Sequence, residues 1–259
     1  MIEIAAYTTR GLCKLANEDR AFVNGAVVSE GLLSEQCEGL CCLAVFDGVS
    51  AGGRGCEASG VASSVLAELW SQSVLESQSG AQDLEAFSRD ALAAMTLEVG
   101  MYRAGLPAGS TVASTVAGLA LKEDGPVIAF NEGDSRAYRW RDGILVRLTT
   151  DHTPEQAMAD LGIAEGKGIR ADKSHAITRA IGLPESADAP GLVVRQGLCL
   201  EGDVFLACSD GLTDIVEDEA IASVLAQGAS AGAKAHTLGV AALRGGTSDN
   251  VTVVVAQTR

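Results

Sequence analysis

Positive charge is scarce in this chain of 259 residues. Its 19 Lys and Arg residues face 34 Asp and Glu residues, which gives a net charge of −15. Proteins that hold a phosphate backbone need clustered Lys and Arg side chains, so this balance argues against a nucleic-acid partner. It leaves room for a metal site, because such a site would use several of the acids.

Long apolar runs and paired cysteines are also missing, and the sequence predicts no leader segment. No run approaches the roughly 18 apolar residues that span a bilayer, and residues 1–4 lack the basic start and apolar core of a signal peptide. The seven cysteines are odd in number, lie mostly within apolar runs and form no Cys-x-x-Cys pair. This usage is typical of reduced thiols and argues against a zinc ribbon or thioredoxin-type site. We expect a cytoplasmic protein without membrane contact.

Short apolar segments that are typical of strands recur along the chain, at residues 2–8, 20–28, 40–46, 112–121, 126–131, 136–140, 192–195, 203–208 and 251–256. Their spacing is too close for a helix between each pair, which favours antiparallel sheets. Helical periodicity is present at 57–77, 82–103, 217–226 and 232–243. The pattern predicts an α+β sandwich in which helices cover sheets. Residues 152–177 contain few large apolar side chains and predict a surface flap.

Acidic residues stand at the ends of several predicted strands. They are Asp47, Asp134 and Asp210 after apolar runs, Asp249 before the last strand, and Glu18 and Asp19 before the second. Adjacent antiparallel strands bring the end of one beside the start of the next, so these acids can converge on one rim. A single Asp-Gly pair is also explained as a turn; it is the recurrence that favours a site.

Converging carboxylates repel one another, and their pKa values rise unless a cation neutralises them. Oxygen-only ligands favour Mg²⁺ or Mn²⁺ over Zn²⁺, and the histidines (His152, His175, His236) show no metal-ligand spacing. Two such ions roughly 3.5–4 Å apart can activate a bridging water for in-line attack on phosphorus.

Three other site patterns fit poorly. "GRGCEA" at residues 53–58 matches a dinucleotide-binding loop, but its first glycine comes late after the strand, and Glu76 falls in a helical pattern. "GIAEGKG" at 162–168 has three residues between its glycines where a P-loop has four, and it lacks the following Ser or Thr. No Gly-x-Ser-x-Gly elbow supports a serine nucleophile.

Taken in order, the segments resemble the PPM family, the type 2C metal-dependent serine/threonine protein phosphatases, in their short bacterial form. The resemblance covers about residue 8 to the C-terminus and rests on "KLANEDR", "AVFDGVSAGG" with "EAS", "GSTVAST", "EGDSRAYRW", "LTTDHT", "ITRAIG", "CSDGLTD" and "GGTSDNVTVVV". It implies one catalytic domain over residues 1–259, built as a four-layer α-β-β-α sandwich with two central antiparallel sheets.

The resemblance also implies a set of site residues around two Mn²⁺ or Mg²⁺ ions. Asp47 would bridge the two ions. Asp210 and Asp249 would complete the coordination shell of one ion, while Glu18 and the Gly48 carbonyl would hold the other ion. Asp19 would orient metal-bound waters, and Asp134 with Asp210 would suit a third, weaker ion. A metal-activated water would then attack phosphoserine or phosphothreonine directly, with no phosphoenzyme. Glycine suits position 48, because a side chain there would crowd the ion.

One departure from the family concerns phosphate binding. The family usually has Arg four residues before the Glu of the acidic pair, whereas this chain has Lys14, which keeps the charge but loses the bidentate fork. We expect weaker phosphate capture as a result. The expected partner is a phosphorylated protein, in a bacterium one that a Ser/Thr kinase modifies, and the expected state is a monomer. The alternative is a phosphatase-fold binding module with little activity.

Overall fold

The computed structural model describes residues 1–259 except 51, 78–82, 163–175 and 184–190. Its described part forms two six-stranded sheets. The first has the order β4 (Gly31–Cys37), β1 (Ile2–Thr9), β12 (Val251–Thr258), β11 (Val204–Cys208), β8 (Arg136–Arg141) and β9 (Ile144–Arg147). The second has the order β10 (Leu192–Leu198), β7 (Pro126–Glu132), β6 (Val116–Lys122), β5 (Leu40–Phe46), β2 (Arg20–Val23) and β3 (Ala26–Val28). The paired strands are antiparallel.

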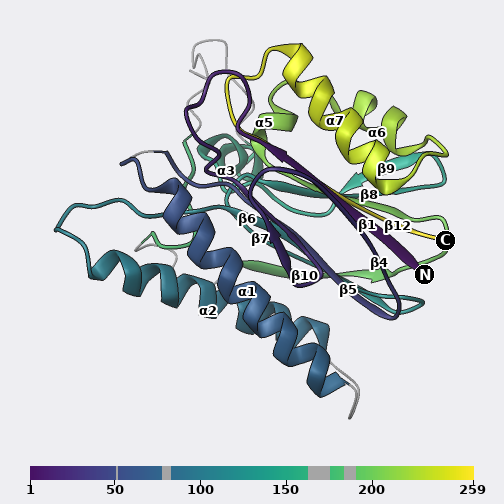
Figure 1. The fold of residues 1–259 in the computed structure, drawn as a ribbon, viewed down its shortest axis with the longest axis horizontal. Coiled ribbons are helices and arrows are strands. Elements are labelled where there is room, and N and C mark those ends of the chain that lie inside the picture. The colour runs from purple at the N-terminus through teal and green to yellow at the C-terminus, as the bar shows by residue number, and fades with distance from the viewer. Residues whose placement is uncertain (51, 78–82, 163–175, 184–190) are drawn as a thin grey trace.

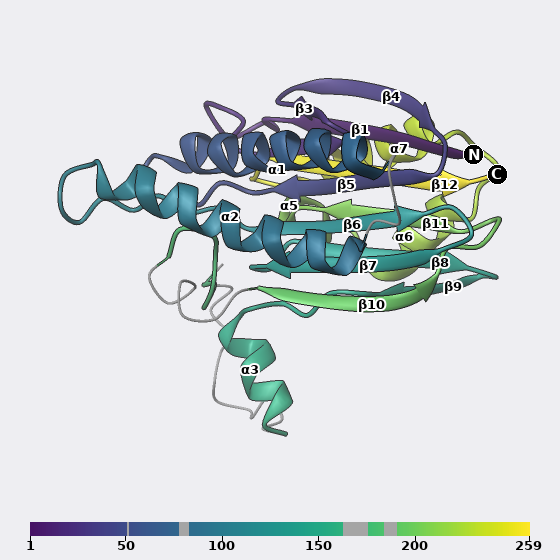
Figure 2. The ribbon, with the colours of Figure 1, turned by 90° about the horizontal axis from the view of Figure 1, so that it is seen from below.

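Helices cover both outer faces of this sandwich (Figure 1). The second sheet is covered by α1 (Gly55–Ser77) and α2 (Leu84–Ala104), and the first by α6 (Asp218–Leu225) and α7 (Ala231–Gly245), with the short α5 (Asp210–Thr213) beside them. A further helix, α3 (Pro154–Asp160), projects from the body of the sandwich near β10 (Figure 2). The predicted four-layer α-β-β-α arrangement is confirmed.

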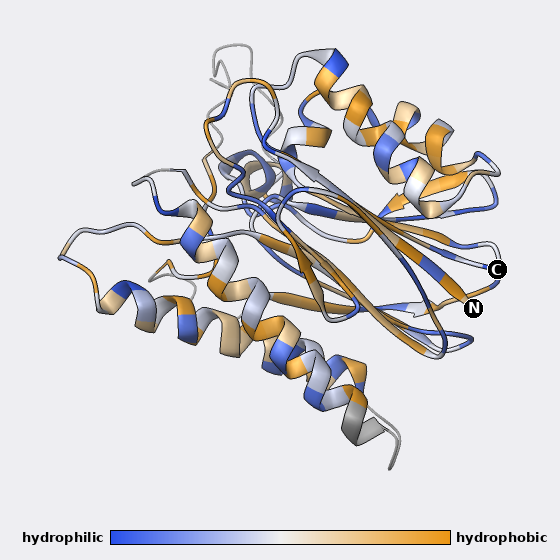
Figure 3. Cartoon of the chain, in the orientation of Figure 1, coloured by the Kyte–Doolittle hydropathy of each residue, from blue (hydrophilic) through white to orange (hydrophobic). Residues whose placement is uncertain are grey.

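The central strands are mostly apolar because each is covered on both faces. All of β12 is buried, as is β5 from Cys41 onward, and Figure 3 shows the resulting hydrophobic band through the sheets. On α1, the buried side chains of Ala58, Ala62, Leu66 and Trp70 recur every four residues and pack on the second sheet. Burial on this scale fixes the strand registers, because a one-residue slip would turn each apolar set to the wrong face.

Some predicted elements differ from the structure. The predicted strand 20–28 is a hairpin of β2 and β3, with Asn24 and Gly25 at positive φ in its two-residue turn. Strands β4 and β9 were not predicted, since both are edge strands with many exposed or half-exposed side chains. The predicted flap begins with α3, and residues 163–175 of it lie outside the described residues.

At one end of the sandwich, the end of one strand lies beside the start of its antiparallel neighbour. Thr9 pairs with Val251, and Arg20 pairs with Phe46, so β1, β12, β2 and β5 all begin or end at this rim. The two chain termini lie together at the opposite end (Figure 1). None of the helices in the described ranges has the length and apolar character to cross a membrane. The rim is where the predicted site residues stand.

Candidate active site

Asp47 and Gly48 follow β5 directly and are held by the strand beside them. The backbone N–H of Asp47 donates to Thr115 Oγ1 at 3.2 Å, and the Asp47 carbonyl accepts from Thr115 N–H at 2.8 Å. A Cβ on Gly48 would lie 2.3 Å from the Gly55 carbonyl oxygen and 2.7 Å from that of Glu18. Glycine is therefore required because three backbones meet here, a different reason from the predicted crowding of an ion.

Glu18 and Asp19 enter the rim at the start of β2, and their environments differ. The Glu18 N–H donates to Asn250 Oδ1 at 2.9 Å, and its carboxylate accepts from Ser50 Oγ. The Asp19 side chain is buried, with Oδ2 accepting from Ser209 Oγ at 2.9 Å and from Thr252 Oγ1 at 2.7 Å. Its second oxygen, Oδ1, is buried without a hydrogen-bond partner.

Asp210 and Asp249 lie on neighbouring segments, one at the end of β11 and one before β12. Gly211 packs so closely on the Asn250 backbone that an added Cβ would lie 1.9 Å from the Asn250 carbonyl oxygen. This contact places the residue after Asp210 against the residue after Asp249. Gly11, at φ +73°, packs similarly on the Asp249 carbonyl, and an added Cβ would lie 2.4 Å from that oxygen.

Asp134 reaches the same rim from the loop between β7 and β8. Its neighbour Ser135 shares a hydrogen bond of 2.7 Å with Thr115 Oγ1, the hydroxyl that also accepts from the Asp47 N–H. His152 is half-buried here rather than a surface residue, because its Nδ1 accepts from the Gly133 N–H at 3.0 Å. The loop that carries Asp134 is thus tied to Asp47 through side-chain hydroxyls.

The carboxylates of this rim raise one another's pKa values. Burial, followed by the charge of Asp210, raises the pKa of Asp134 to about 7. Burial raises the pKa of Asp19 to about 7 against the opposing hydrogen bonds from Thr252 and Ser209. Burial and the charges of Asp19 and Asp210 hold the pKa of Asp47 well above its usual range. These four acids are therefore gathered in one poorly solvated place.

Lys14 lies inside this acidic group. Its Nζ is 2.9 Å from Asp249 Oδ1 and donates to Ser50 Oγ at 3.2 Å. Burial lowers the pKa of Lys14, but the nearby carboxylates of Asp249, Asp47 and Glu18 outweigh it and raise the pKa. The ammonium thus neutralises part of the acidic charge, and its predicted role in phosphate binding stays a prediction.

The chemistry of the acids fits divalent metal ions. Hard oxygen donors, a buried Asp19 oxygen without a partner and mutually raised pKa values are what a bound cation would satisfy. Within the described ranges, no three acidic, His or Cys side chains form a group that could hold an ion.

Sequence reasoning missed the polar residues that position the acids. Asn250 donates to the carbonyls of Arg10 and Ala16 at 2.9 and 3.0 Å and accepts from Glu18 N–H, so it fixes the loop before the acidic pair. Thr252 and Ser209 hold Asp19. Their signal in the sequence is small polar residues inside or beside apolar strands, such as "SDNVTVV".

The chain was compared with known proteins. No family model matches it. The serine/threonine protein phosphatase PstP of Mycobacterium tuberculosis is 43% identical over 130 residues, which are 48% of this chain and only 23% of that protein. The serine/threonine phosphatase Stp of Listeria monocytogenes is 26% identical over 251 residues, 96% of this chain and 93% of that protein.

A solved structure extends the likeness to the whole fold. The catalytic domain of PstP in complex with two manganese ions matches over 99% of both chains, with 29% identity and a TM-score of 0.73. Over nearly its whole length, this chain is similar in sequence and in fold to these bacterial serine/threonine phosphatases. This similarity confirms the resemblance drawn from the motifs. The motif acids Asp47, Asp210 and Asp249 are among those that the fold brings to a single rim.

Proposed function

We propose that this chain is a phosphatase of the PPM type, which hydrolyses phosphoserine and phosphothreonine in proteins with two Mn²⁺ or Mg²⁺ ions at the rim. The observation that supports it best is the group of poorly solvated carboxylates around Asp47, whose pKa values are raised by burial and by one another. Bound there, the ions would supply positive charge and lower the pKa of water so that it becomes a nucleophile near neutral pH.

The proposal gives each residue a role. Asp47 would contact both ions, Asp210 and Asp249 would complete one shell, and Glu18 with the Gly48 carbonyl would hold the other. Asp134 with Asp210 would hold a third, weaker ion. The partnerless Oδ1 of Asp19 would accept a hydrogen bond from a water and orient it. Lys14 now forms an ion pair with Asp249. When a metal ion neutralises Asp249, the Lys14 ammonium would be free to attract the substrate phosphate.

Rigidity of the acids follows from their backbone contacts. Asp47 is fixed by Thr115 on both its N–H and its carbonyl, and Asp210 is fixed because Gly211 lies against Asn250. Ligands held in this way need little reordering when an ion binds, which favours catalysis.

Phosphate release from a phosphothreonine peptide tests the proposal. With Mn²⁺ we expect turnover by the wild-type chain, its loss on adding EDTA, and at least about a hundredfold lower turnover for Asp47→Asn. Asp218→Asn is a suitable control, because Asp218 contacts Tyr138 away from the rim. Equal rates for the wild type and Asp47→Asn would contradict the proposal.

The alternative function is a PPM-fold binding module with little activity, which the Lys14 substitution favours. Against it stands the full set of acids, because carboxylates gathered on one rim destabilise a protein that does not use them. Calorimetric titration with Mn²⁺ distinguishes the two, since a module without a metal centre would take up little or no metal.

The wider setting belongs to the same proposal. We treat residues 1–259 as one catalytic domain with a flap at 152–177, acting as a monomer on phosphoproteins that a Ser/Thr kinase modifies. All seven cysteines are free thiols, which suits a reducing compartment and supports a cytoplasmic location. A part in bacterial signalling would follow from the proposed activity on phosphoproteins.

A further inference from the structure

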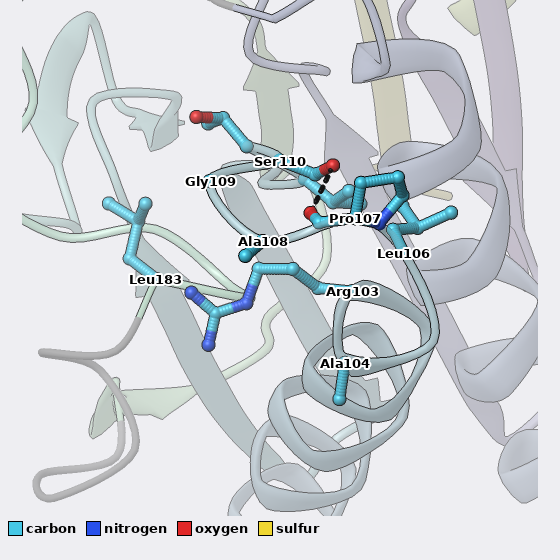
Figure 4. A pocket seen from close by; sticks show the side chains of 10 residues that line it. Arg103, Ala104, Leu106, Pro107, Ala108, Gly109, Ser110 and Leu183 are labelled. Atoms are coloured by element: carbon cyan, nitrogen blue, oxygen red, sulfur yellow. Dashed lines mark hydrogen bonds between the residues drawn. The ribbon is translucent and has the colours of Figure 1, made fainter.

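A pocket of about 620 Å³ lies at the end of α2, outside the group of acids. Its wall consists of the last turn of α2, the loop that leads to β6, and Leu183. Figure 4 shows the Arg103 side chain reaching across this space toward Leu183. Ser110 Oγ donates to the Pro107 carbonyl at 2.8 Å and closes the loop on itself. We call this space the Arg103 pocket.

The Arg103 guanidinium is half-buried and has no hydrogen bond or ion pair within the described part of the chain. A basic residue in the last turn of a helix is favourable to the helix dipole. The carbonyl of Arg103 and those before it accept from the backbone N–H groups of Gly105 and Leu106, however, and not from the guanidinium. Arg89 on the same helix forms an ion pair with Glu85, so Arg103 is the one of these two whose donors remain available to a ligand.

The Arg103 pocket adjoins the candidate active site through paired backbone. The segment that follows β5 stays paired with the segment that precedes β6. Thr115 N–H donates to the Asp47 carbonyl at 2.8 Å, and Val49 N–H donates to the Ala113 carbonyl at 2.9 Å. Further along, the Thr111 side chain lies 3.1 Å from an added Cβ on Gly52. Four residues of extended chain span at most about 14 Å, so Thr111, in the pocket wall, lies within roughly that distance of Thr115.

We propose that the Arg103 pocket binds an acidic side chain, Asp or Glu, of the phosphoprotein substrate. The inference rests on the proposed phosphatase function. A guanidinium offers five donors in a planar fork that matches a carboxylate, and the space is large enough for a side chain. A substrate in extended conformation advances about 3.3 Å per residue, so an acid three or four residues from the phosphorylated one can cover a distance of about 14 Å.

Charge makes this docking selective. The chain has a net charge of −15, and the acids of the rim repel an acidic substrate. Arg103 offers a positive contact beside that rim. A substrate whose acidic residue reaches Arg103 therefore binds more tightly, whereas acidic residues elsewhere in the substrate weaken binding. Because both charges are partly exposed, the preference weakens as salt is added.

Peptide kinetics with Mn²⁺ test the proposal. A phosphothreonine peptide with Ala at the flanking positions is compared with peptides that carry one Glu three or four residues to either side. For one of the Glu peptides we expect a KM about three- to tenfold lower than for the Ala peptide, with kcat unchanged. Arg103→Gln removes this preference, Arg103→Lys keeps part of it, and Arg89→Gln, the matched control on the same helix, keeps all of it.

Turnover of p-nitrophenyl phosphate, which is too small to reach the pocket, separates the possible failures. If Arg103→Gln lowers turnover of this compound and of every peptide equally, Arg103 is a structural residue and the proposal is wrong. If the wild type hydrolyses all peptides with one KM, the docking role is wrong while the phosphatase function stands. If the wild type turns over neither p-nitrophenyl phosphate nor peptide, the proposed function fails and the docking inference with it.

Discussion

Replacing Asp19 with Asn should stabilise the metal-free protein, although it removes a proposed catalytic group. Burial raises the pKa of Asp19 from 3.8 to about 7. A tenfold change in proton binding is worth about 1.4 kcal/mol, so holding this carboxylate ionised in the folded chain costs on the order of 4 kcal/mol. Asparagine keeps an oxygen that accepts from Ser209 and Thr252 without carrying the charge.

The sign of the effect depends on pH. Because the pKa is higher in the folded state, the folded chain binds the proton more tightly than the unfolded chain between pH 4 and 7. The stability of the wild-type protein in EDTA therefore falls as the pH rises through this window. We expect Asp19→Asn to raise the free energy of unfolding by up to about 4 kcal/mol at pH 8 and by only about 1.7 kcal/mol at pH 5.

Urea unfolding in EDTA at both pH values measures this gain. Asp203→Asn is the matched control, because Asp203 is equally buried but forms a two-point ion pair with Arg141. There the same substitution should lower the free energy of unfolding by about 2 kcal/mol. The reasoning is refuted if Asp19→Asn is no more stable than the wild type at pH 8, or if its gain is the same at both pH values.

Three further predictions follow from the site. Asp47→Asn should weaken Mn²⁺ binding in calorimetry at least tenfold, since an amide is a poorer bridging ligand, and unchanged binding would show that Asp47 is not a ligand. Gly211→Ala should lower the free energy of unfolding by about 1–3 kcal/mol and weaken Mn²⁺ binding, because its Cβ would lie 1.9 Å from the Asn250 carbonyl; a fully stable variant would contradict the close approach. Lys14→Arg should lower KM for a phosphopeptide while kcat is unchanged, and an unaltered KM would remove Lys14 from phosphate binding.

The central, buried strands could be predicted from the sequence, because neither of their faces is exposed to solvent and their residues are therefore mostly apolar. β12 and β5 stand out as apolar runs, and the acids that follow or precede such runs, Asp47 and Asp249, reach the rim as expected. β4 alternates exposed and half-exposed residues at the sheet edge, which leaves too weak a pattern to predict.

Other features of the site depend on contacts between segments far apart in the chain. The hydrogen bond between Asn250 and Glu18 joins residues 232 positions apart, and the depth of Asp19 follows from its contacts with Ser209 and Thr252. The ion pair of Lys14 with Asp249 is of the same kind. No local pattern encodes such pairs, so the motifs identified the acids but not the residues that hold them.

The central claim is that Asp47 joins two metal ions at this rim. Anomalous diffraction from crystals of the wild-type chain grown with Mn²⁺ measures it directly. The account predicts two strong manganese peaks roughly 3.5–4 Å apart, with the Asp47 carboxylate between them and Asp210 and Asp249 on one ion. A single peak, or two peaks that Asp47 does not touch, would contradict it.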